Sequence, residues 1–220
     1  MIDPASINLS KFLADWYGPP DKPTRQLPAD YSWIPSPLAS WYQVSSRWER
    51  SLVTLKKFYK PEEIKVTEGM EIFLEDPGEA IWAFNPDSPW DVYEGQLYTP
   101  WEKAREPLNE FLIHNAVQEA AYNATSRRSC DEVELGLLQS ILTPMTEVAF
   151  GGWRWPRPGH RIFMNSTLIA DIGPAIEEVE PWGDKPGYVS IQIGSSTQTG
   201  LAYLDEIHAI DWVTSGHRGD

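Results

Sequence analysis

Apolar residues in the first part of the chain recur at the helical period. They predict a helix over residues 6–17, with Ser6 as its N-cap and Gly18-Pro19-Pro20 at its end. Its apolar stripe consists of Leu9, Phe12, Leu13, Trp16 and Tyr17. After a proline-rich loop, Ser36-Pro37 is typical of an N-cap followed by proline in the first turn. The helix that it begins has a largely aromatic face made of Leu38, Trp41, Tyr42, Ser45 and Trp48.

The central part predicts a hairpin and then a long helix. Residues 70–84 contain two apolar runs joined by a turn at 75–78, and we expect a loop over 85–100. A helix is predicted from Pro107 to about Ala124, with apolar residues on two sides, so two layers of structure should cover it. Between those sides lies a polar row made of Glu110, His114 and Gln118. We expect His114 in this row to be solvated.

Short strands dominate the last third. Asp131 and Glu134 resemble a capping box, which predicts a helix that ends before Pro144. Strands are predicted over 161–164, 166–170, 188–193 and 201–204. Because helices come first and strands cluster without βαβ alternation, we predict an α+β fold. It has a mainly antiparallel sheet, with the N-terminal and central helices packed around it.

We expect one domain over residues 1–220. Residues 1–125 would supply helices and an acidic hairpin, and residues 126–220 would supply a helix and the C-terminal strands.

The charge of the chain is strongly negative and uneven. The 220 residues carry a formal net charge of −14. Residues 1–60 contain 8 basic and 5 acidic side chains (+3), residues 61–125 contain 3 and 14 (−11), and residues 126–220 contain 7 and 13 (−6). This balance disfavours nucleic acid and anionic membranes and favours a basic protein partner.

The sequence predicts a cytoplasmic protein. No stretch approaches the ~18 consecutive apolar residues that a membrane span needs. The N-terminus lacks the basic and apolar regions of a signal peptide. Cys130 is the single cysteine, which excludes an intramolecular disulfide.

Motifs for catalysis or metal binding do not occur in the sequence. None of the four histidines has metal-ligand spacing, and there is no nucleophile elbow or phosphate-binding loop. Cys130 lies beside Asp131 and Glu132, whose charges discourage a thiolate. We therefore predict no catalytic residue, no metal and no cofactor.

An alternative stays open because tryptophans and carboxylates are plentiful. A sugar-acting enzyme would need a cleft with two carboxylates ~5–10 Å apart, at least one with a raised pKa, beside exposed tryptophans. Five tryptophans lie in proline- or glycine-rich loops: Trp90, Trp101, Trp153, Trp155 and Trp182.

Four short motifs follow one another in residues 15–124. They are Asp15-Trp16-Tyr17-Gly18, Leu27-Pro28, Ile72-Phe73-Leu74-Glu75 with Ala80-Ile81-Trp82-Ala83, and Pro107-Leu108 with Phe111-Leu112. Their order and spacing resemble the SUKH superfamily, which includes the yeast cell-wall assembly regulator and many bacterial toxin-immunity proteins. That family commonly has Glu-Asn-Gln-Gly where this chain has Glu75-Asp76-Pro77-Gly78. The resemblance implies a non-enzymatic α+β domain that neutralises a cognate toxin, often a basic nuclease, inside the cell.

We therefore predict a protein-binding module, an immunity-type protein that meets a basic toxin domain with the central acidic segment. The predicted docking carboxylates are Glu68, Glu71, Glu75, Asp76, Glu79, Asp87, Asp91 and Glu94. Trp90 and Tyr93 are predicted aromatic anchors. All ten should lie outward on one face. The alternatives are the sugar-acting enzyme and a regulatory scaffold without a toxin partner.

Overall fold

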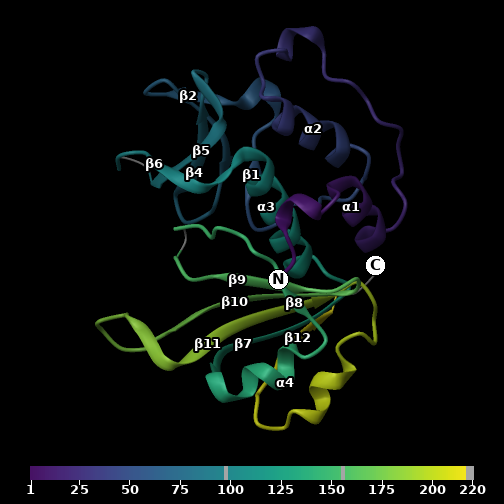
Figure 1. The fold of residues 1–220 in the computed structure, drawn as a ribbon, viewed down its shortest axis with the longest axis vertical. Helices are drawn as coiled ribbons and strands as arrows, with labels where there is room; N and C mark the ends of the chain where they lie inside the picture. The colour runs from purple at the N-terminus through teal and green to yellow at the C-terminus, as the bar shows by residue number, and fades with distance from the viewer. Residues whose placement is uncertain (97–98, 155–156, 217–220) are drawn as a thin grey trace.

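The computed structural model, which describes residues 1–96, 99–154 and 157–216, contains two antiparallel sheets with a helix between them (Figure 1). Helix α3 (Leu108–Tyr122) forms this middle layer and contacts strands of both sheets. Helices α1 (Leu9–Tyr17) and α2 (Ser36–Ser45) pack beside it. The predicted α+β class with mainly antiparallel pairing is confirmed, and the strands form two sheets rather than one.

The first sheet follows the order β1-β3-β4-β5-β6, and β2 also pairs with β3. Its strands are β1 (Lys57–Phe58), β2 (Lys65–Thr67), β3 (Met70–Glu75), β4 (Ala80–Asn85), β5 (Ser88–Gln96) and β6 (Glu102–Pro107). The hairpin predicted over 70–84 is confirmed by β3 and β4. The loop predicted over 85–100 is wrong, because β4 ends in a tight turn. Strand β5 begins directly after this turn and pairs with β4. The Asn85 side chain stabilises that turn by accepting the amide of Asp87 at 2.8 Å.

The second sheet follows the order β12-β7-β11-β10-β9-β8. Its strands are β7 (Ser126–Glu134), β8 (Thr146–Glu147), β9 (Arg161–Met164), β10 (Leu168–Ile176), β11 (Asp184–Ser195) and β12 (Val213–Gly216). The predicted strands over 161–164, 166–170 and 188–193 correspond to β9, β10 and β11. Residues 201–204 instead lie at the 3-10 helix η5 (Ala202–Glu206). The predicted capping box is also wrong, because Asp131 and Glu134 belong to β7.

Helices α1 and α2 begin close to the predicted positions, whereas the helix predicted after Asp131 begins only at Leu138. Asn8, not Ser6, caps α1, and its side chain accepts the amide of Lys11 at 2.9 Å. Pro35, not Ser36, is the N-cap of α2. The helix after β7 is α4 (Leu138–Leu142), and the other single turns are η1 (Pro4–Ser6), η2 (Ala29–Tyr31), η3 (Pro61–Glu63) and η4 (Leu135–Leu137). Of the helices in the described ranges, none has both the length and the apolar character that a membrane crossing requires.

Helix α3 is buried because both sheets pack on it, as its two apolar sides predict. Eleven of its 15 residues are buried. Its alanines let the second sheet approach closely: a Cβ placed on Gly194 of β11 would lie 2.4 Å from the Ala121 carbonyl oxygen. Four polar residues of α3 are thereby buried as well: His114, Asn115, Gln118 and Glu119. His114, expected in solvent, is 2% exposed.

Candidate functional site

The predicted docking carboxylates are divided between turns and both faces of the first sheet. Glu68 and Asp87 lie in exposed turns at one end of β3 and β4, and Asp76 and Glu79 lie in the turn at the other end. The Asp76 carboxylate accepts two backbone amides of its own turn, at 2.9 and 2.7 Å. These four residues therefore form two separate groups at opposite ends of the β3–β4 hairpin.

Glu71 and Glu94 face the inner side of the sheet. Glu94 pairs with Trp82 across β4 and β5 and is 2% exposed. Glu71 pairs with Phe84 across β3 and β4 and is half-buried. Burial raises the pKa of both carboxyl groups. The prediction that Glu94 lies on an outward docking surface is thus corrected, because its side chain is buried beside the core residue Trp82.

Glu75 and Asp91 are paired with lysines of neighbouring strands. Lys103 Nζ lies 2.7 Å from Asp91 Oδ2. Lys57 and Lys65 place their Nζ atoms 3.4 and 3.9 Å from the Glu75 carboxylate. Each pair offsets much of the field that would steer a basic partner.

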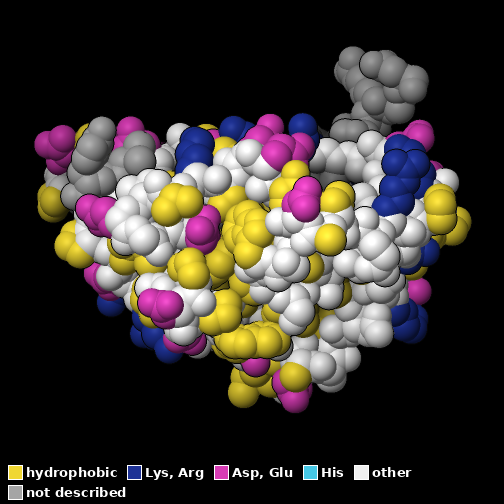
Figure 2. Space-filling view, turned by 90° about the horizontal axis from the view of Figure 1, so that it is seen from above, with side chains coloured by type: hydrophobic (Ala, Val, Ile, Leu, Met, Phe, Trp, Pro, Cys, Tyr) yellow, Lys and Arg dark blue, Asp and Glu magenta, His cyan; other side chains and the backbone are white. Residues whose placement is uncertain are grey.

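The two predicted aromatic anchors also differ. Trp90 is 56% exposed, whereas Tyr93 is half-buried and packs on the small apolar cluster of the outer face. On the face seen in Figure 2, acidic side chains are scattered among hydrophobic and other ones. The structure does not bring the ten predicted residues onto one face, because successive side chains of a strand point to opposite sides of a sheet.

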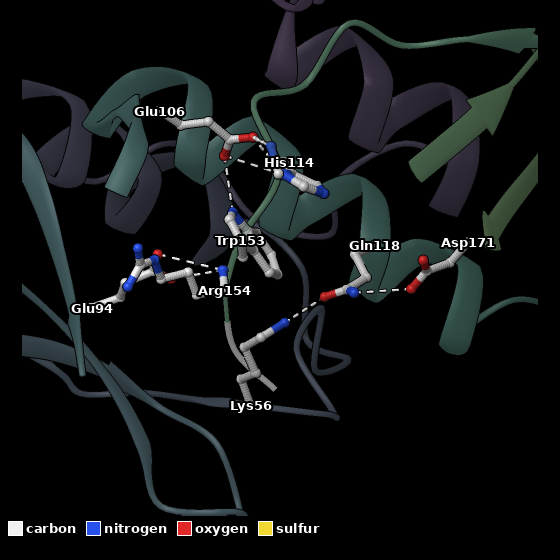
Figure 3. A network of polar contacts seen from close by, with 9 residues as sticks. Lys56, Glu94, Glu106, His114, Gln118, Trp153, Arg154 and Asp171 are labelled. Carbon is white, nitrogen blue, oxygen red and sulfur yellow. Dashed lines mark hydrogen bonds and ion pairs between the residues drawn. The ribbon is translucent and has the colours of Figure 1, made fainter. Parts of the chain in front are cut away.

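A buried polar network links the two sheets through α3 (Figure 3). Lys56 Nζ donates to Gln118 Oε1 at 2.5 Å, and Gln118 Nε2 donates to Asp171 Oδ2 at 2.9 Å. His160 Nδ1 lies 2.9 Å from the other oxygen of Asp171. The chain of contacts runs from the segment before β1, across α3, to β10.

The ammonium group of Lys56 lies among aromatic rings. Its Nζ is 4.4 Å from the centroid of the Trp153 ring and 5.8 Å from that of Trp82. Burial lowers the pKa of Lys56 to about 8, although Glu119 and Asp171 favour the charged form. The rings and Gln118 partly replace the lost hydration.

A second set of contacts surrounds Glu106 of β6. His114 Nδ1 lies 2.8 Å from its Oε1, Trp153 Nε1 donates to its Oε2 at 2.9 Å, and the Gly152 amide donates at 3.0 Å. Burial alone would raise the pKa of Glu106, but His114 and these donors outweigh it and hold the pKa below its usual range. The His114 ring stacks on Phe150 with 4.1 Å between centroids. The predicted solvated histidine is therefore a buried partner of a carboxylate.

The carboxyls of Glu94 and Glu106 have the unequal pKa values that a sugar-acting enzyme uses, one raised and one lowered. Each is 2% exposed, and the neighbouring Trp82 and Trp153 are buried too. A sugar ring has no access to such groups. This pair does not supply the cleft that the enzyme alternative requires.

A more exposed acidic surface lies at the tip of the β10–β11 hairpin, residues 176–184, which we call the acidic tip. This segment has four carboxylates and no basic residue. Its apolar side chains point into solvent: Val179 is 74% exposed, Trp182 67% and Ile176 46%. The hairpin projects beyond the rest of the second sheet (Figure 1).

A hollow of about 470 Å³ lies beside the acidic tip. It is lined by Asp131, Glu132, Pro174, Ile176, Glu177, Glu178, Trp182 and Ser190. Two pairs tie the base of the hairpin to its surroundings, Lys185 with Glu132 at 2.6 Å and Arg157 with Asp184 at 2.9 Å. The run of four acids around Trp182 in the sequence could have indicated this surface, but the larger charge of residues 61–125 obscured it.

No group of three His, Cys, Asp or Glu side chains in the described part of the chain is arranged to hold a metal ion. No family model, curated protein or solved structure matches this chain.

Proposed function

We propose that this chain is a non-enzymatic protein-binding module of the immunity type, which binds a basic toxin domain in the cytoplasm and blocks it. The observation that carries the proposal is the acidic tip, where exposed apolar side chains are surrounded by carboxylates. The similarity of residues 15–124 to the SUKH superfamily supports the same class of function.

The acidic tip has the composition of a protein interface. Aromatic residues are enriched among the residues that dominate binding energy, and Trp182 is the aromatic residue of this surface. Apolar side chains that protrude together into solvent bury little surface within their own chain. A binding partner could cover them. Glu177, Glu178 and Glu180 surround them with negative charge.

Charge selects the partner. A carboxylate-rich surface on a chain of net charge −14 attracts a basic protein over distances of about a Debye length, ~8 Å at physiological salt. Such steering raises association rates by about 10- to 1,000-fold. Trp182 would then hold the docked complex by filling an apolar pocket of the partner.

The test first searches the neighbouring genes for a polymorphic toxin, whose toxic domain is then purified and immobilised for kinetic binding measurements. The variant Glu177→Lys/Glu178→Lys/Glu180→Lys should lower the association rate at least about tenfold at low salt. Trp182→Ala should raise the dissociation constant about 10- to 100-fold, mainly through faster dissociation.

A control variant changes the net charge by the same amount elsewhere. Glu68→Lys/Glu79→Lys/Asp87→Lys also removes three exposed carboxylates, but from turns of the first sheet. It should change the association rate about twofold or less, since charges beyond a Debye length are screened. Equal effects of the two triple variants, or unchanged affinity in Trp182→Ala, would overturn the assignment of the acidic tip.

A further inference from the structure

A groove of about 600 Å³ lies between α2 and residues 50–62, with residues 25–27 along its edge. We call it the basic groove. Its volume is within the range of about 300–1,000 Å³ that small-molecule sites occupy. It is lined by segments of the first third of the chain and does not include the acidic tip.

The charge of the basic groove is opposite to that of the chain. Five basic residues and one acidic residue, Glu62, line it, whereas the whole sequence has 18 basic and 32 acidic residues. The basic residues are Arg25, Arg50, Lys56, Lys57 and Lys60. Like charges gathered around one hollow repel one another, and an anion bound between them would relieve that repulsion.

Arg50 and Lys56 differ in how their charges are met. Arg50 Nη2 donates to a neutral group, the backbone oxygen of Asn123, at 3.3 Å, so its positive charge stays in place. The Lys56 ammonium is buried, donates to Gln118 and lies near Glu119 and Asp171, so the field of the groove comes from the other four cations. No ion pair of Arg25 occurs within residues 1–96, 99–154 and 157–216, and its side chain is exposed.

Lys57 and Lys60 do have carboxylate partners. Their Nζ atoms lie 3.4 Å from Glu75 and 3.7 Å from Glu63, and both lysines are well exposed. Exposed pairs of this kind contribute only about 0–1 kcal/mol, so they can exchange partners with a bound anion.

The wall of the groove is apolar and partly aromatic. Tyr42 and Phe58 are half-buried there, and Phe58 packs on Trp41 with 5.1 Å between ring centroids. The Tyr42 hydroxyl donates to the backbone oxygen of Tyr59 at 2.7 Å, which fixes the wall to β1 and its neighbour. A flat ring can pack on this wall while its charged group meets the cations.

The segment that leads into the groove through Lys56 is preformed. The carboxylate of Glu119 accepts the backbone amides of Thr54, Leu55 and Lys56 at 2.7, 2.9 and 3.0 Å. These bonds hold residues 54–56, which directly precede Lys57 and Phe58 of the lining, so a ligand would not have to order this part of the chain.

We propose that the basic groove binds a small aromatic anion, with its ring against Tyr42 and Phe58 and its phosphate, carboxylate or sulfonate group among the cations. A small anion suits the site better than an acidic protein segment does. The remaining surface, which carries most of the 32 carboxylates, repels a large acidic partner, whereas a small ligand experiences mainly the local field.

The experiment is isothermal titration of the full chain with adenosine monophosphate, with adenosine and inorganic phosphate as the ring-only and anion-only probes. Anilinonaphthalene sulfonate serves as a second aromatic anion. We expect each aromatic anion to bind at least about tenfold more tightly than adenosine or phosphate.

Two matched variants locate the binding. Arg25→Glu/Lys60→Glu reverses two exposed lining charges and should weaken binding of both aromatic anions at least about tenfold. Lys11→Glu/Lys22→Glu makes the same change in net charge at exposed lysines outside the groove and should alter affinity about twofold or less.

Absence of saturable binding of both aromatic anions at about 10 mM would overturn the proposal. Equal weakening by the two variants, or binding of a poly-glutamate peptide without either aromatic anion, would overturn it too. The acidic tip does not enter these measurements, so their failure would leave the proposed function standing.

Discussion

Replacing Glu119 by alanine tests how the N-terminal segment is attached to α3. Glu119 is fully buried, and its carboxylate accepts three consecutive backbone amides of residues 54–56. In Glu119→Ala all three amides lose their acceptor.

The magnitude follows from the three bonds. A hydrogen bond to a charged group contributes ~1.5–3 kcal/mol, and a buried donor left unpaired costs ~1–3 kcal/mol. Thr54 is exposed, so water can reach part of this backbone. We therefore expect a loss of about 4 kcal/mol in the free energy of unfolding. For a chain of this size that corresponds to a fall in Tm of roughly 8–16 °C. Glu119→Gln keeps one carbonyl oxygen and should lose about half as much.

The assay is urea unfolding followed by tryptophan fluorescence, with Glu110→Ala as the control on the same helix. Glu110 is half-buried, and its substitution should change the free energy of unfolding by about 0.5 kcal/mol or less. If Glu119→Ala unfolds within about 1 kcal/mol of Glu110→Ala, the three amides are not held by this carboxylate and the reasoning fails.

Two further predictions concern the core. The pKa of Lys56 is about 8 in the folded protein against 10.5 in the unfolded chain, so the folded state binds fewer protons between these values and its stability rises with pH there. Relative to Lys56→Met, the wild type should gain about 2 kcal/mol in urea unfolding between pH 7.5 and 9.5, and a flat difference would contradict the lowered pKa. Gly194→Ala should cost ~1–3 kcal/mol because its Cβ would meet the Ala121 carbonyl oxygen at 2.4 Å, whereas Gly136→Ala, with open space around it, should be close to neutral. Equal melting temperatures of the two glycine variants would show that α3 and β11 can separate freely.

Local chemistry in the sequence was sufficient for several elements. The apolar stripe of α1, the hairpin of β3 and β4, and the two-sided α3 depend on periodicity and turn residues, which act over a few positions. The strands β5 and β7 were missed because their sequences are rich in proline or charge. They exist because a neighbouring strand pairs with them, and strand preference depends on that context.

The sequence by itself determined the α+β class, the strong negative charge and the two-layer cover of α3. Only the tertiary structure decided which charges are available to a partner. It buried Glu94 and His114, paired Glu75 with lysines, and left the acidic tip exposed. The reason is that a charge is neutralised or enclosed by groups far away in the chain, as Glu119 is by amides 63 to 65 residues before it, and no local pattern records such contacts.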